Sequence, residues 1–118
     1  MRGFKIRPFT SYVRDMNHAI DKILSFSENL SFNQFQMDGP ERDAILYNFQ
    51  ILGEAVKHVP RSLQSKNKQI PWNSMVALRN DIVHEYYDPD DEIMWEIIQT
   101  DLHKNQLDLQ KFLTKVES

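Results

Sequence analysis

A segment in the second half of the chain carries side chains suited to acid–base chemistry on a phosphate. It reads Arg79-Asn-Asp-Ile-Val-His84-Glu-Tyr86. The guanidinium of Arg79 is a permanent cation whose planar donor fork fits phosphate oxygens. His84 belongs to the residue type that exchanges protons near neutral pH. Such a pair is sufficient to cleave an RNA phosphodiester without a metal, with the imidazole moving protons and Arg79 stabilising the phosphoryl charge.

Helix geometry constrains how these side chains can cooperate. At 100° per residue, Arg79 and His84 lie about 140° apart around the axis, whereas Arg79 and Tyr86 lie about 20° apart. The two candidate catalytic residues therefore flank an edge rather than sharing a face. Two protomers that meet along this helix would place two Arg and two His around one cleft, which predicts a homodimer with a composite site. Trp72, Met75 and Trp95 are apolar groups that a lone four-helix bundle need not fully cover, which also favours a dimer. Asn80 and Asp81 are supporting candidates that could orient His84 or contact RNA.

Each of these residues also has a simpler structural interpretation. Arg79 can form an ion pair with a neighbouring acid, and His84 can bond to backbone at a helix end. Tyr86 can be a half-buried aromatic residue. A second carboxylate, Glu54, stands among apolar neighbours and is explained by an Arg or N–H partner in the bundle. Gly53 beside it is explained by close helix packing.

The hydrophobic pattern before the motif predicts two long helices. Apolar residues spaced three and four apart predict a helix over about residues 10–28, and residues 31–36 suggest a short turn. Pro40 suits the first turn of a second helix, and Pro60 is expected to end it. The wide apolar stripe of this second helix predicts packing on two sides. It consists of Ala44, Ile45, Phe49, Ile51, Leu52, Ala55, Val56 and Val59.

Two further helices are predicted in the second half. Residues 61–70 form a polar connector, and Pro71 begins the helix that carries the motif. Asp88-Pro89 interrupts the pattern, and a last helix is expected from about Asp90 to residue 116, spanning ~40 Å. No alternating strand pattern is present. The sequence predicts an all-α fold, an up-and-down bundle of four main helices with short extra turns, in a single domain over residues 1–118.

Composition excludes several classes of protein. The 118 residues contain no Cys, which excludes disulfide scaffolds, thiol nucleophiles and Cys-based metal sites. No apolar run approaches a membrane span, and no signal peptide is visible, so we expect a cytoplasmic protein without a membrane partner. No cofactor is indicated.

Charge is distributed unevenly along the chain. The net charge of −3 argues against coating nucleic acid by bulk charge. Residues 81–101 hold eight acids and no Lys or Arg, whereas residues 1–14 and 57–68 each hold four basic residues and no acid. Solvated helix ends and loops explain such runs most simply. The alternative is that the two basic stretches flank a phosphate-binding cleft.

The motif and its surroundings resemble the HepT family within the HEPN group of small helical proteins. The Arg-x4-His-x-Tyr spacing of residues 79–86 carries the resemblance. It extends to the Leu-Gly-Glu-Ala segment at 52–55, to Ile-Pro-Trp at 70–72 and to Trp-Glu-Ile-Ile at 95–98. The likeness covers nearly the whole chain and agrees with the helix order predicted above.

The resemblance implies a function and partners. HepT-like proteins are the toxins of two-gene prokaryotic toxin–antitoxin systems, metal-independent ribonucleases that act as homodimers, with tRNA among the suspected targets. Their antitoxin is a minimal nucleotidyltransferase, MntA, that transfers AMP from ATP to the motif tyrosine. By position, Arg79 and His84 would be catalytic and Tyr86 would be AMPylated, with Tyr87 ranked second.

Two other interpretations remain open. Asp15-x-x-His18 and Asp81-x-x-His84 imitate the carboxylate–His pairs of di-iron bundles, with Glu54 and Glu96 as bridging candidates. A catalytically silent HEPN-like scaffold that binds a nucleotidyltransferase or a nucleotide is the second alternative.

Overall fold

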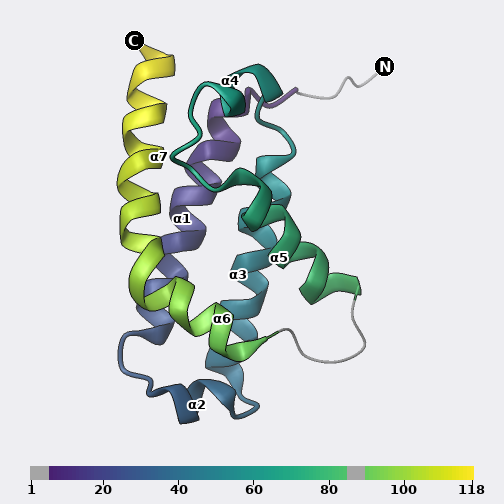
Figure 1. The fold of residues 1–118 in the computed structure, drawn as a ribbon, viewed down its shortest axis with the longest axis vertical. Coiled ribbons are helices and arrows are strands. Elements are labelled where there is room, and N and C mark those ends of the chain that lie inside the picture. Colours follow the sequence, from purple (N-terminus) through teal and green to yellow (C-terminus); the bar gives the residue numbers. More distant parts are fainter. Residues whose placement is uncertain (1–5, 85–89) are drawn as a thin grey trace.

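The computed structural model describes residues 6–84 and 90–118, and these residues form helices and no strand. The prediction of an all-α bundle is confirmed (Figure 1). The four long helices are α1 (Phe9–Ser27), α3 (Pro40–Val56), α5 (Trp72–His84) and α7 (Leu102–Glu117). The short elements are α2 (Phe32–Gln36), α4 (Arg61–Ser65), α6 (Asp91–Glu96) and the π-helical turn η1 (Ile97–Asp101).

The long helices pack in the order α7, α1, α3 and α5. Helices α1 and α3 form the largest contact, α7 packs on α1, and α5 packs on α3 (Figure 1). The predicted two-sided packing of α3 is confirmed, because its wide apolar stripe serves both α1 and α5. The core is made of side chains that are nearly inaccessible to solvent, among them Met16, Ile20, Ile45, Phe49, Leu52, Leu109 and Phe112.

Helix boundaries follow local chemistry. Ser31 begins α2 through a capping box with Gln34, and Pro40 occupies the first turn of α3 as predicted. Helix α3 ends at Val56, and turns connect it to Pro60. The side-chain amide of Gln64 donates hydrogen bonds to the carbonyls of Val56 (3.2 Å) and Val59 (3.0 Å). These bonds pair carbonyl groups that have no partner within the helix.

The last segment differs from the single straight helix expected from the sequence. Asp90 caps α6 by accepting a hydrogen bond from the N–H of Ile93 (3.1 Å), but η1 then separates α6 from α7. Within this turn, the hydroxyl of Thr100 donates to the carbonyl of Glu96 (2.7 Å), and the N–H of Leu102 bonds to the carbonyl of Ile97. The wider turn changes the direction of the chain (Figure 1).

A buried arginine joins three elements at one end of the bundle. Arg42 on α3 is 4% exposed, and its guanidinium forms a 2.8 Å ion pair with Asp91 on α6. It also donates to the carbonyl of Phe35 on α2 (3.2 Å) and lies over the ring of that residue. The start of the last helical segment is thereby fixed against α3.

One expectation about exposed apolar groups is wrong. Trp72 and Met75 are 5% and 6% exposed, because the ring of Trp72 packs against Phe112 and its Nε1–H bonds to the carbonyl of Asn67 (3.0 Å). Trp95 is half-buried against Phe32 and Phe35. These residues therefore do not form the free apolar surface that was expected to support a dimer. Among the described residues, no helix combines the length and apolarity needed to cross a membrane.

Gly53 allows α3 and α5 to approach closely, as predicted. A Cβ atom at this position would lie 2.3 Å from the Cβ of Arg79 and 2.7 Å from the carbonyl oxygen of Met75. Both distances are far below van der Waals contact, and one of them involves backbone. The position therefore accepts no side chain unless the two helices move apart.

We predict that Gly53→Ala lowers the free energy of unfolding by about 1–3 kcal/mol, the usual cost of overpacking a well-packed contact. This loss should appear although Ala is the better helix former. Gly39→Ala is the matched control, because its added Cβ would have only a side-chain oxygen of Glu41 nearby, at 3.7 Å. Urea denaturation of both variants measures the difference, and equal stabilities would contradict the close-contact argument.

Candidate active site

Arg79 lies at the contact between α5 and α3 and is held by two hydrogen bonds. Its Nη2 forms a 2.8 Å ion pair with the Oε1 atom of Glu54, and its Nη1 donates to the Oδ1 atom of Asn80 (3.0 Å). The side chain is 16% exposed, and its Nε–H is buried without a hydrogen-bond partner in the described part of the chain. The Nε–H donor is thus uncommitted within a fixed side chain.

Glu54 has one of the partners expected from the sequence, an arginine. It follows Gly53 on α3, so the close approach of the helices brings its carboxylate to Arg79. Its side chain remains 49% exposed, and Lys57 Nζ also approaches it, at 3.9 Å. The ion-pair interpretation of Arg79 is confirmed, and the acid comes from a different helix. A half-exposed pair contributes little stability, so its main physical effect is to orient the guanidinium.

His84 is the last residue of α5 and is exposed to solvent. Neither its side chain nor that of Asp81 forms a hydrogen bond or ion pair with another described residue. Asp81 therefore does not orient the imidazole here, and Asn80 contacts Arg79 instead. Tyr86, the predicted modified residue, lies outside the described residues.

The site combines a fixed cation with an accessible imidazole. His84 follows Arg79 by five positions, which corresponds to about 7.5 Å along the axis of α5. The guanidinium is fixed against α3, whereas the imidazole is open to a substrate. Such an arrangement can stabilise charge on a phosphate while a separate group exchanges protons.

Sequence reasoning identified Glu54 but assigned it no part in the site. The signal was available in the adjacent Gly53, because a glycine inside a helix indicates close approach of another element. What the sequence lacked was the identity of the residues on the facing helix. In the structure, the residues that face Gly53 are Met75 and Arg79.

The di-metal arrangement is not assembled in the described part of the chain. No group of three or more His, Asp or Glu side chains gathers there in a way that could hold a metal ion. Asp15, one of its proposed ligands, is instead engaged by Arg7 in a 2.8 Å ion pair. The two carboxylate–His pairs therefore do not converge.

Comparison with known proteins places the chain in a family. The family model described as ribonuclease HepT-like matches residues 16–116, a span that contains every candidate site residue. A candidate RNase of Methanocaldococcus jannaschii is 25% identical over 91% of this chain and 88% of its own length. A protein of Thermococcus cleftensis named as a probable ribonuclease HepT is 28% identical over 81% of this chain and 87% of its own length.

A candidate RNase of Caldanaerobacter subterraneus subsp. tengcongensis is 26% identical over 92% of this chain and 95% of its own length. No solved structure matches the chain significantly. The match of the family model extends over most of the sequence and agrees with the Arg-x4-His-x-Tyr spacing and the all-α bundle. The chain belongs to the HepT-like ribonuclease family.

Proposed function

We propose that this protein is the toxin of a two-gene toxin–antitoxin system and a metal-independent endoribonuclease. One observation carries the proposal: the Arg79 guanidinium is fixed against α3 by Glu54, five residues before an exposed imidazole, in a HepT-like chain. In the reaction, the ribose 2′-oxygen bonds to phosphorus, the bond to the 5′-oxygen breaks, and a 2′,3′-cyclic phosphate forms. Arg79 stabilises the phosphoryl oxygens, and His84 moves a proton.

The active form in this proposal is a homodimer that meets along α5. One imidazole cannot act as base and acid at the same moment, whereas two copies supply two. Helix α5 packs chiefly on α3, and it carries the 42% exposed Val83 beside the half-buried Ile82. These side chains offer an apolar edge next to His84. Sedimentation at micromolar concentration should give a dimer, and a stable monomer would contradict the composite site.

The antitoxin in this proposal is an MntA-like nucleotidyltransferase that modifies Tyr86. The phenol oxygen attacks the α-phosphorus of ATP, a new P–O bond forms, and pyrophosphate leaves as the phenol loses its proton. The attached AMP adds bulk and negative charge two residues from His84. Both effects oppose the approach of an RNA phosphate.

We predict that unmodified protein cleaves total tRNA in excess EDTA and that His84→Ala slows cleavage by about 10²- to 10⁴-fold, the usual contribution of acid–base catalysis. His103→Ala, which removes an exposed histidine on α7, should cleave like the wild type. Gel analysis of end-labelled tRNA measures the rates. Without cleavage, and with an intact mass that excludes modification, the HEPN-like scaffold becomes the better interpretation.

Glu54 is a positioning residue in this proposal, and Glu54→Ala should lower kcat by roughly 10- to 100-fold because small displacements of a catalytic cation are costly. Glu54→Gln should retain more activity, since an amide oxygen still accepts from Arg79. The control is Glu117→Ala, which breaks the exposed pair with Arg14 elsewhere. Separate kcat and KM values should place the loss in kcat while the melting temperature changes little. Equal kcat in Glu54→Ala and Glu117→Ala would refute the role.

Incubation with ATP and an MntA-like nucleotidyltransferase should add whole AMP units to this protein and abolish RNA cleavage. Tyr86→Phe should remain unmodified and active, whereas Tyr87→Phe should still be modified. Intact-mass spectrometry provides the measurement. Modification of Tyr86→Phe, or full activity after complete modification, would contradict the assignment.

A further inference from the structure

Three planar side chains stack on one another where the start of α1 meets the end of α3. The rings of Tyr12 and His58 are nearly parallel, at 7°, with centroids 3.9 Å apart. The guanidinium carbon of Arg7 lies 4.1 Å from the centroid of the Tyr12 ring. Both groups therefore contact the ring of Tyr12. His58 is exposed, so its second face is left for another group.

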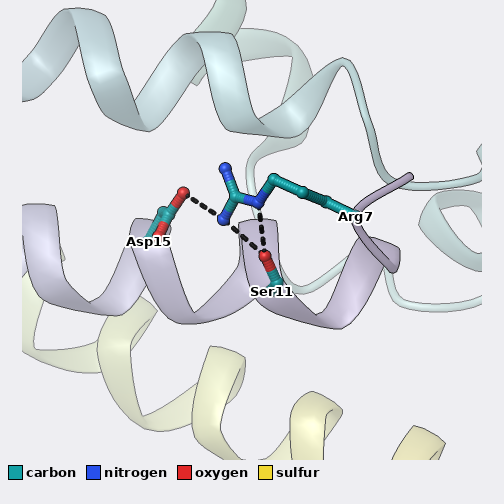
Figure 2. A network of polar contacts seen from close by, with 3 residues as sticks. All are labelled: Arg7, Ser11 and Asp15. Carbon is teal, nitrogen blue, oxygen red and sulfur yellow. Dashed lines mark hydrogen bonds and ion pairs between the residues drawn. The ribbon is translucent and has the colours of Figure 1, made fainter. Parts of the chain in front are cut away.

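The guanidinium of Arg7 is held by two side chains of α1. Arg7 Nε donates a 2.7 Å hydrogen bond to Ser11 Oγ, and its Nη2 forms the 2.8 Å ion pair with Asp15 (Figure 2). Figure 2 shows the side chain lying along α1, with its guanidinium directed into the space between α1 and α3. The hydrogen bond to Asp15 raises the pKa of Arg7 above its ordinary value, so the group stays charged. A fixed plane loses little entropy when a further ring stacks on it.

The stack adjoins the candidate active site. Tyr12 and His58 line a hollow of about 220 Å³ between α1 and α3, and Glu54 lines the same hollow. His58 lies in the turn that follows α3, four positions after Glu54, and Glu54 holds Arg79. A nucleotide next to a phosphate at Arg79 can therefore reach the imidazole.

Charged side chains of both signs surround the stack: Arg7 pairs with Asp15, and Lys57 approaches Glu54. Lys57 immediately precedes His58, and Arg61 follows at the start of α4, both exposed. Exposed aromatic planes beside cations are the usual surface for unpaired bases, which stack without a requirement for particular hydrogen bonds.

We propose that the outer face of His58, backed by Tyr12 and Arg7, is a stacking subsite for an unpaired base of the RNA, next to the scissile phosphate. Lys57 and Arg61 attract the phosphates on either side of that base. The proposal rests on the proposed ribonuclease function and specifies its substrate as single-stranded or looped RNA.

The test uses a short single-stranded 2′-O-methyl oligonucleotide, which cannot be cleaved because its 2′-oxygen is blocked. Fluorescence anisotropy measures its affinity for the full chain, and single 2-aminopurine substitutions along it report stacking as quenched emission. His58→Ala removes the platform, whereas His58→Phe keeps a ring and removes the imidazole. His103→Ala is the matched control for an exposed histidine elsewhere.

We expect His58→Ala to weaken binding by roughly 5- to 100-fold, the range for losing one stacked base. His58→Phe should bind within about threefold of the wild type, in line with the sequence tolerance of stacking. The wild type should quench 2-aminopurine at one position of the oligonucleotide, and His58→Ala should not. Equal affinity and quenching in His58→Ala and His103→Ala would overturn the proposal.

Three further outcomes are distinguishable. Cleavage of tRNA by the wild type with His58-independent binding would refute the platform and leave the ribonuclease function intact. Binding that depends on His58 without cleavage would refute the ribonuclease function and leave the platform intact. The third outcome is that His58→Ala melts at a lower temperature or sediments differently, while the affinity of the folded protein for RNA is unchanged. The stack would then only hold α1 against α3 or join two copies, and the platform would be refuted.

Discussion

The absence of a side chain at residue 53 controls the geometry of this protein. Only a glycine lets the backbone of α5 lie close enough to α3 for the Cβ of Arg79 and the carbonyl of Met75 to occupy that space. The same approach brings Glu54 within 2.8 Å of the guanidinium. One backbone contact therefore joins the packing of the outer helix to the orientation of the candidate catalytic cation.

The two candidate catalytic residues differ in their freedom because they occupy different parts of α5. Arg79 faces α3 and is fixed there, whereas His84 ends the helix and is exposed. A fixed cation is useful for stabilising charge, since it needs no reorganisation during the reaction. An accessible imidazole is useful for proton transfer, since it must reach the reacting oxygen. The tertiary structure thus gives each group the environment that its proposed task requires.

Net charge describes this molecule poorly. The acids of residues 81–101 dominate the total, whereas Arg7 contacts the ring of Tyr12, and Lys57 immediately precedes His58 in the sequence. The electrostatic attraction of a charge extends over about a Debye length, and stacking acts only between rings in contact. A chain that is acidic as a whole can therefore still place individual cations beside its candidate active site.

The sequence by itself determined the helical class, most helix boundaries and the candidate residues. Proline, capping residues and apolar spacing act locally, so Pro40, Ser31 and the stripe of α3 were sufficient for those predictions. It did not determine the break at η1, because the turn depends on how Ile98 and Leu102 meet the rest of the core. It also predicted free surfaces at Trp72 and Met75, which α5 and its neighbours bury.

Contacts between distant segments were decided only by the tertiary structure. The periodicity of α3 located Glu54 and the motif located Arg79, but 25 residues separate them, and no local rule pairs them. Likewise, His58 reaches the ring of Tyr12, which Arg7 also contacts, only because α1 and α3 pack together. Local preferences act over one or two turns of chain, whereas these pairings depend on how helices approach one another in space.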